Sequence, residues 1–179
     1  MLRLRDLISM LIFGIAALSM SELAWPKDAD RDAVDSFAKP DSIRFGATVK
    51  QMETALQHLC SRMETRRIDP PFLDAVKHRQ MQIDCEGFIF RDKPRHAEFV
   101  FGDDDLKMVW VMTDPQERAA LEGAMRSAYG PPNHTNEKYV GFTSARVALR
   151  LDRAEVLFYA KSAEQDVLPD ITARSGSVH

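Results

Sequence analysis

Cysteine and histidine are scarce in this 179-residue chain, which has two and five of them respectively. Neither residue type forms the C-x-x-C or H-x-x-x-H spacing typical of metal, redox and haem motifs, and the G-x-S-x-G motif of serine hydrolases is missing. We therefore expect no catalytic residues, no metal site and no cofactor, and we interpret the protein as a non-enzyme. The isolated histidines are His58, His78, His96, His134 and His179.

An excess of positive charge is also missing. The formal net charge is −3, and the first 21 residues carry +1, from Arg3 and Arg5 against Asp6, so the rest of the chain is near −4. Nucleic-acid binders instead carry a basic excess, so we exclude nucleic acid as a partner. Beyond residue 21, no apolar stretch approaches the roughly 20 residues that a membrane-spanning helix needs.

The N-terminus does contain one apolar run, over residues 7–20, and Arg3 and Arg5 precede it. Small residues at positions 17, 19 and 21, at the end of this run, have the spacing of a cleavage site, so the pattern predicts a secretory signal peptide over residues 1–21. An uncleaved N-terminal anchor is the alternative, and only in that case do we expect contact with a membrane. We expect a periplasmic or secreted protein, or in the alternative a membrane-anchored protein that faces the periplasm.

Cys60 and Cys85 both lie in the part that would be exported. An even number of cysteines in an oxidising compartment predicts one disulfide bond, although two buried thiols or a pair of metal ligands are alternatives. Closing a loop of this length would stabilise the fold by about 3.5 kcal/mol in the chain-entropy model. We interpret the bond as structural.

Three further segments follow the predicted signal peptide. Residues 22–41 are polar and lack a sustained apolar period, which predicts a linker. Residues 42–161 carry the periodic apolar pattern of a single globular domain. Residues 162–179 are polar and aperiodic and are predicted to be a disordered tail.

The pattern within residues 42–161 predicts an α+β fold. Thr48 and Gln51 form a capping box for a first helix, and a second helix runs from Asp114 to Gly130. Alternating strands joined by polar turns follow each helix, and the Asp103–Asp105 run is interpreted as a turn. We expect an antiparallel sheet with helices packed on one face, built from two loosely repeated helix-plus-strands units.

Alternation also predicts which strand residues share a face. In the strand that ends near residue 101, Ala97, Phe99 and Phe101 should face one way. In the next strand we expect one face to hold four apolar residues, Leu106, Met108, Trp110 and Met112.

Three segments resemble small exported domains with the β-lactamase-inhibitor-like fold, including outer-membrane assembly lipoproteins. They are Phe45-Gly46-Ala47-Thr48, the Phe99–Leu106 hairpin and the helix exit Tyr129-Gly130-Pro131. The resemblance implies a binding function and supplies no catalytic residues. The chain lacks the lipid-anchoring cysteine of the lipoprotein members.

Basic residues concentrate between Arg62 and Arg79, where acidic residues partly offset them. This segment is either a solvated loop of mixed charge or a docking surface for an acidic partner or anionic head groups. The candidate binding residues are Arg62, Arg66, Arg67, Lys77 and Arg79.

The leading functional hypothesis is a non-enzymatic, exported, protein-binding accessory protein whose partner is another exported or envelope protein. The alternative is a small-molecule or lipid binder, or an unrecognised hydrolase, that uses a pocket between the sheet and the helices. The expected lining of that pocket is Phe88, Phe99, Trp110 and Met125.

Overall fold

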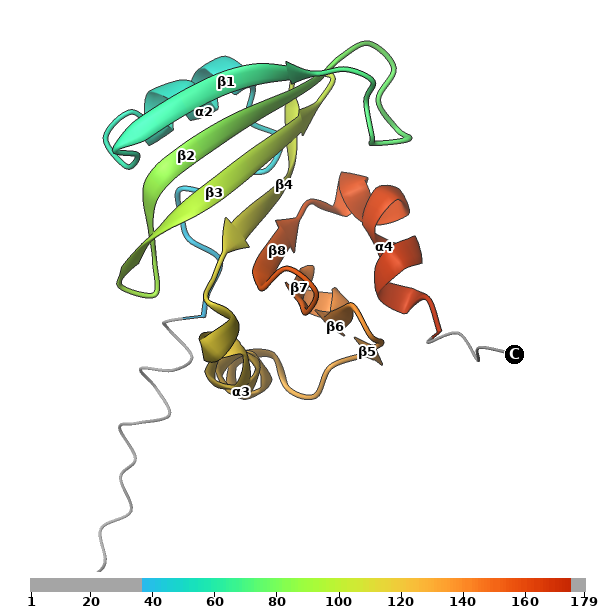
Figure 1. Ribbon diagram of the computed structural model, residues 1–179. Coiled ribbons are helices and arrows are strands. Elements are labelled where there is room, and N and C mark those ends of the chain that lie inside the picture. The colour runs from blue at the N-terminus through green and yellow to red at the C-terminus, as the bar shows by residue number, and fades with distance from the viewer. Residues whose placement is uncertain (1–36, 175–179) are drawn as a thin grey trace, which may run out of the picture.

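The structure is a computed structural model that describes residues 37–174 (Figure 1). The predicted signal peptide, residues 22–36 of the predicted linker and the last five residues lie outside this range. Between residues 37 and 174, none of the helices has the length and apolar character needed to cross a membrane.

The described residues form an α+β fold around one eight-stranded antiparallel sheet, with strand order β1-β2-β3-β4-β8-β7-β6-β5. The predicted fold class is therefore confirmed. The strands are β1 (Arg62–Ile68), β2 (Gln80–Phe90), β3 (Lys93–Gly102), β4 (Asp105–Met112), β5 (His134–Thr135), β6 (Tyr139–Phe142), β7 (Val147–Arg150) and β8 (Glu155–Tyr159). The helices are α2 (Val49–Leu56), α3 (Arg118–Tyr129) and α4 (Glu164–Thr172), with short 3₁₀ turns at Pro115–Glu117, Thr143–Ala145 and Lys161–Ala163.

The order of the elements repeats. Helix α2 precedes the four strands β1–β4, and α3 precedes the four strands β5–β8. The last strands of the two units, β4 and β8, pair antiparallel in the middle of the sheet, from Met108 opposite Tyr159 to Met112 opposite Glu155. The two units therefore build one continuous sheet.

The first predicted helix begins at its capping box, whereas the second begins with a 3₁₀ turn after Asp114 and becomes α-helical at Arg118. The side chain of Thr48 accepts a hydrogen bond from the Gln51 N–H at 3.2 Å, and Gln51 Oε1 accepts one from the Thr48 N–H at 2.9 Å. Asp114 caps the 3₁₀ turn that leads into α3. Gly130 ends α3 with φ of +78°, a conformation that favours glycine.

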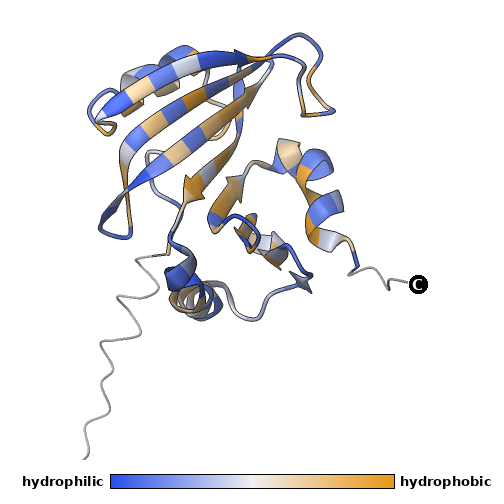
Figure 2. Ribbon diagram, in the orientation of Figure 1, coloured by the Kyte–Doolittle hydropathy of each residue, from blue (hydrophilic) through white to orange (hydrophobic). Residues whose placement is uncertain are grey.

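Apolar side chains form a core on each face of the sheet, and Figure 2 shows apolar and polar residues alternating along β2 and β3. Helices α2 and α3 cover the first face, where Met52 and Met125 pack against β2–β4 and β6–β8. Helix α4 covers part of the second face, where Val167 and Ile171 pack. The two predicted helices share one face as expected, and α4 adds a helix on the other.

The prediction that residues 162–179 are disordered is wrong for residues 164–172, which form α4. Ala163, Val167 and Ile171 recur every four residues and are buried. The Asn136 side-chain amide also donates to the carbonyls of Asp170, Ile171 and Ala173, at 2.9 to 3.1 Å. These bonds satisfy the carbonyl groups that a helix C-terminus leaves without partners.

The predicted linker also contributes to the core at its C-terminal end. Phe37 is fully buried, with its ring 5.8 Å from that of Phe90 and 6.1 Å from that of Tyr129. The Tyr129 hydroxyl donates to the Phe37 carbonyl oxygen at 2.5 Å. The folded unit therefore begins at residue 37 at the latest, not at residue 42.

The predicted face assignment is correct for β3 and partly wrong for β4. Ala97, Phe99 and Phe101 lie together in the first core. Leu106 lies there too, whereas Met108 belongs to the second core. The reason is a bulge, because Val100 pairs with Met108 and the next residue of β3 pairs with Leu106, which places one extra residue on β4.

The Cys60–Cys85 disulfide bond is present and joins the turn after α2 to β2. The two Cα atoms lie 5.3 Å apart, and Cys85 is fully buried in the first core. The bond therefore closes the loop that contains β1, as the structural interpretation requires.

Candidate functional site

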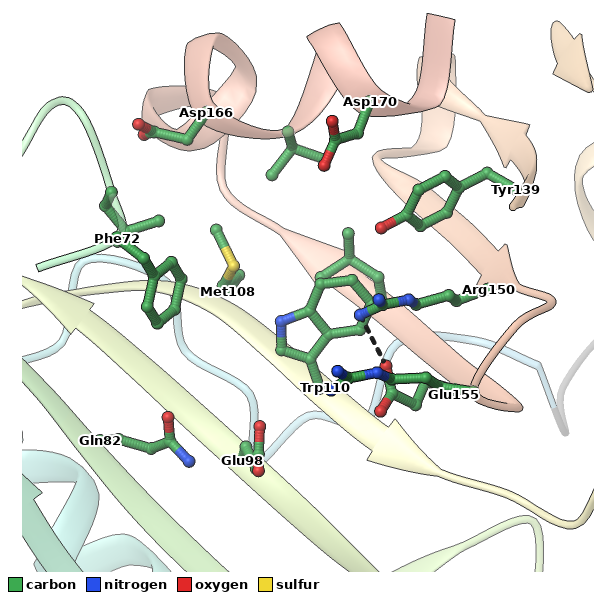
Figure 3. A pocket seen from close by; sticks show the side chains of 14 residues that line it. Phe72, Gln82, Glu98, Met108, Trp110, Tyr139, Arg150, Glu155, Asp166 and Asp170 are labelled. Atoms are coloured by element: carbon green, nitrogen blue, oxygen red, sulfur yellow. Dashed lines mark hydrogen bonds and ion pairs between the residues drawn. The ribbon is translucent and has the colours of Figure 1, made fainter. Parts of the chain in front are cut away.

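A groove with a volume of about 340 Å³ lies between the second face of the sheet and α4. Figure 3 shows that its side chains come from the sheet on one side and from α4 and the β1–β2 connection on the other. The lining residues are Phe72, Leu73, Gln82, Glu98, Met108, Trp110, Tyr139, Arg150, Arg153, Glu155, Leu157, Asp166, Val167 and Asp170.

The floor of the groove is apolar and aromatic. Trp110 and Met108 project from β4 into it, and Leu157 comes from the neighbouring strand β8. Phe72, on the connection between β1 and β2, lies at the rim and is 55% exposed. A large aromatic side chain that is exposed beside a groove is available to a ligand or partner.

Arg150 forms one wall of the groove by stacking against aromatic rings. Its guanidinium carbon lies 5.4 Å from the centre of the Trp110 ring and 5.9 Å from that of Tyr139. Its Nε donates to Asp152 at 2.7 Å and its Nη1 to Glu155 at 3.3 Å. Two carboxylates and two rings thus hold the guanidinium, so this wall is rigid before any ligand arrives.

Burial raises the pKa values of two groups that line the groove near Arg150, Glu155 and Tyr139. Burial raises the pKa of Glu155 above its ordinary value, although the charge of Arg150 acts in the opposite direction. Burial likewise raises the pKa of Tyr139, so its hydroxyl is neutral at physiological pH. Tyr139 can therefore donate a hydrogen bond to a ligand.

The rim of the groove is acidic. Asp166 and Asp170 project from α4, and Glu98 projects from β3 on the opposite side (Figure 3). Asp166 Oδ1 also accepts a hydrogen bond from the Ala75 N–H at 3.2 Å, which joins α4 to the β1–β2 connection. With Glu155, the lining holds four carboxylates but only two guanidinium groups.

A second hollow, of about 150 Å³, lies on the face of β1–β3 beside the groove and shares Glu98 with it. Arg66 Nε lies 2.8 Å from Asp84 Oδ2, and Arg62 Nη2 lies 3.7 Å from Glu86 Oε1. The full lining is Arg62, Glu64, Arg66, Asp84, Glu86, His96 and Glu98. Its arginines are therefore already paired with carboxylates.

Asp84, His96 and Glu98 bring possible metal-ligand atoms within 4.8 Å of one another. However, Asp84 Oδ1 accepts from Gln82 at 2.6 Å and Oδ2 accepts from Arg66 at 2.8 Å. Burial alone would raise the pKa of Asp84, but these hydrogen bonds outweigh it and hold that pKa below its ordinary value. Both oxygens of Asp84 are therefore already bonded, and His96 Nδ1 lies 2.8 Å from Glu86 Oε1, so two of the three candidate ligands already have protein partners.

The five basic residues singled out from the sequence do not share one surface. Arg62 and Arg66 line the second hollow, while Arg67 is exposed on the other face of β1, because neighbouring strand residues alternate. Lys77 and Arg79 lie on the β1–β2 connection. The predicted docking segment is therefore an edge strand followed by a loop, and its charges point in several directions.

Asp103 and Asp104 form the predicted turn between β3 and β4, with Asp105 as the first residue of β4, and Asp103 also organises the β1–β2 connection. The Asp103 carboxylate accepts hydrogen bonds from the backbone N–H groups of Lys77, His78 and Arg79, at 2.7 to 3.1 Å. These hydrogen bonds, first those from Lys77 and His78, lower the pKa of Asp103 to about 2. Asp103 therefore stays ionised and keeps the loop in place at physiological pH.

Of the expected pocket residues, only Trp110 lines the groove. Phe88, Phe99 and Met125 are at most 2% exposed and fill the first core on the other face of the sheet. Sequence reasoning missed Arg150 and the two acidic residues of α4. The spacing of Ala163, Val167 and Ile171 could have indicated the helix, but no local pattern marks Arg150.

Comparisons of the chain with protein-family models, with curated proteins and with solved structures found no match. The resemblance to the β-lactamase-inhibitor-like fold therefore stays a prediction, and the functional argument below depends on the groove and its surroundings.

Proposed function

We propose that this protein is a non-enzymatic, exported accessory protein that binds another exported or envelope protein in the groove beside α4. The observation that carries the proposal is the Trp110–Arg150–Tyr139 stack next to the exposed ring of Phe72. Trp, Tyr, Phe, Met and Arg are the residue types enriched at the centre of protein interfaces, where they supply most of the binding energy.

The rigidity of the groove supports binding to a polypeptide. Its walls belong to the sheet and α4, and Asp166 and Asn136 join α4 to its neighbours through hydrogen bonds. A surface that is already ordered loses little conformational entropy when a partner docks. The aromatic floor can therefore contribute to affinity without first being organised.

The residue types in the groove favour binding over catalysis. Among the described residues that line it there is no serine, threonine, cysteine or histidine, so its candidate acid–base groups are four carboxylates and Tyr139. The most buried carboxylate, Glu155, already contacts Arg150. The lining thus resembles an interface more than a catalytic site.

Export is supported by the disulfide bond, since such bonds persist mainly in oxidising compartments. The basic and apolar N-terminal pattern indicates the route of export. Both observations concern compartment and are independent of the groove.

Site-specific photo-crosslinking in the producing cells tests the proposal. A benzophenone amino acid replaces Phe72 at the groove rim, and in a matched control it replaces Ile89, which is 59% exposed but does not line the groove. We expect a discrete protein adduct from position 72 and none of the same mass from position 89. The same adducts from both positions, or none from position 72, would contradict the proposal.

A small-molecule binder is the second candidate, because a volume of about 340 Å³ falls within the range of ligand pockets. An acyl chain fits less well, since it would have to desolvate the carboxylates of the lining. A thermal-shift screen of polar metabolites discriminates the candidates. A stabilising compound whose effect disappears in Trp110→Ala would favour this second function.

A further inference from the structure

We infer that the segment bound by this protein is an extended, basic polypeptide that lies along the groove and the second hollow, with lysine or arginine side chains next to apolar ones. The inference depends on the proposed function and adds the chemistry of the partner to it. Three observations carry it: the balance of charges, the connection between the two hollows and the apolar floor.

The charge balance favours a cationic partner. The two linings together hold seven carboxylates and four guanidinium groups. Of the guanidinium groups, those of Arg62, Arg66 and Arg150 already pair with carboxylates. Several carboxylates on this surface are therefore not paired with an arginine, and they favour a cationic partner. Docking of an acidic partner on the arginines is not favoured.

The carboxylates that remain for a partner lie at the rim. Asp170 is exposed on α4, and Glu98 is partly exposed at the junction of the two hollows. Figure 3 shows these two side chains on opposite sides of the aromatic floor. A chain that passes over Trp110 would thus meet one carboxylate on each side.

The connection between the hollows favours an extended chain over a compact ligand. Glu98 belongs to both linings, so the two hollows lie next to each other, one beside α4 and the other on β1–β3. A compact molecule would use the groove alone, whereas an extended polypeptide can occupy both hollows. Successive side chains of an extended chain point to opposite sides, so apolar residues can face the floor while basic residues reach the rim.

The rings of Trp110 and Tyr139 already have a cation as neighbour. Arg150 already stacks against Trp110 and Tyr139. Incoming cations can therefore pair with the carboxylates, and the exposed ring of Phe72 and the partly buried side chain of Trp110 are left for apolar side chains. We therefore expect both the basic and the apolar side chains of the bound segment to contribute to affinity.

Peptide titration of the full chain tests the inference. Trp110 becomes the only tryptophan in a Trp25→Phe variant, so its fluorescence reports on the groove. The probes are three blocked octapeptides in which leucine alternates with lysine, serine or glutamate. We expect saturable binding of the lysine peptide that weakens as salt is added, weaker binding of the serine peptide and none of the glutamate peptide.

Variants that neutralise carboxylates at the rim test whether these groups bind the basic side chains. The double variant Glu98→Gln/Asp170→Asn should bind the lysine peptide about fivefold or more weakly, because it loses two partly exposed ion pairs. The matched control is Glu122→Gln on α3, which packs on the other face of the sheet and should leave the affinity unchanged.

The outcomes separate this inference from the proposed function. Equal binding of all three peptides would overturn the charge assignment and leave polypeptide binding intact. Displacement of the lysine peptide by equimolar spermine would overturn the polypeptide assignment in favour of a small polycation. A position-72 adduct without binding of the lysine peptide would refute the basic segment alone, whereas the absence of both would refute the proposed function too.

Discussion

Replacing Ile171 with alanine should weaken the packing of α4 on the sheet and lower the stability of the fold. Ile171 is 1% exposed and packs between α4 and the sheet. Its Cγ2 atom lies 2.5 Å from the position that a Cβ would take on Gly141 of β6, so the helix approaches the strand at a glycine. A residue this tightly enclosed leaves a cavity when it is shortened.

The magnitude follows from the atoms removed. Three buried carbon atoms at about 0.8 kcal/mol each account for about 2.4 kcal/mol of transfer free energy. The cavity adds to this cost, and the better helix propensity of alanine offsets about 0.4 kcal/mol. We expect Ile171→Ala to lower the free energy of unfolding by about 3 kcal/mol.

Urea denaturation followed by circular dichroism and by tryptophan fluorescence measures this change. Leu168→Ala is the matched control, because Leu168 lies on the same helix but is only partly buried, and it should cost about 1 kcal/mol. A loss below about 0.5 kcal/mol for Ile171→Ala would match an exposed position and would refute the packing of α4 on the sheet.

Three further measurements follow from the structure. Replacing both Cys60 and Cys85 with alanine should lower the unfolding free energy by about 3.5 kcal/mol, measured without reductant, and a loss below about 1 kcal/mol would contradict the chain-entropy account of the bond. Hydrogen bonds from Lys93 and a neighbouring arginine lower the pKa of Glu117 to about 2, below its ordinary value of 4.5, so the carboxylate stabilises the fold above about pH 4.5 and loses this effect as the pH falls toward 2. The stability difference between the native chain and Glu117→Gln should therefore shrink over that range in urea titrations, and a constant difference would contradict the ion pairs. The Tyr159 hydroxyl is buried without a hydrogen-bond partner among the described residues, so Tyr159→Phe should leave the thermal midpoint unchanged or raise it, and a clear decrease would reveal a partner.

The features that could be predicted from the sequence are those that depend on residues close together in the chain. The Thr48–Gln51 capping box and the Asp114–Gly130 boundaries place α2 and α3 because capping depends on residues a few positions apart. Alternation likewise predicts the faces of β3. Each of these signals needs only a short window of sequence.

Other features depend on contacts between distant residues. The bulge that reverses the facing of Leu106 arises from how β4 pairs with β3, and its own sequence alternates regularly. Phe37 is an isolated aromatic residue in a polar segment, and its burial follows from partners 53 and 92 positions away, Phe90 and Tyr129. Local periodicity contains no information about such pairings.

The groove could not be predicted because its prediction required α4. Pro169 lies inside this helix and argues against a helix in sequence terms, since proline lacks the N–H that the helix would use. Burial of Val167 and Ile171 and the bonds from Asn136 offset that cost. Without α4 the second face of the sheet has no acidic rim, and the basic residues of 62–79 become the most conspicuous charged group. Of those basic residues, Arg62, Arg66 and Arg79 are paired with carboxylates in the fold. Asp170, a carboxylate at the rim of the groove, belongs instead to the segment predicted to be disordered.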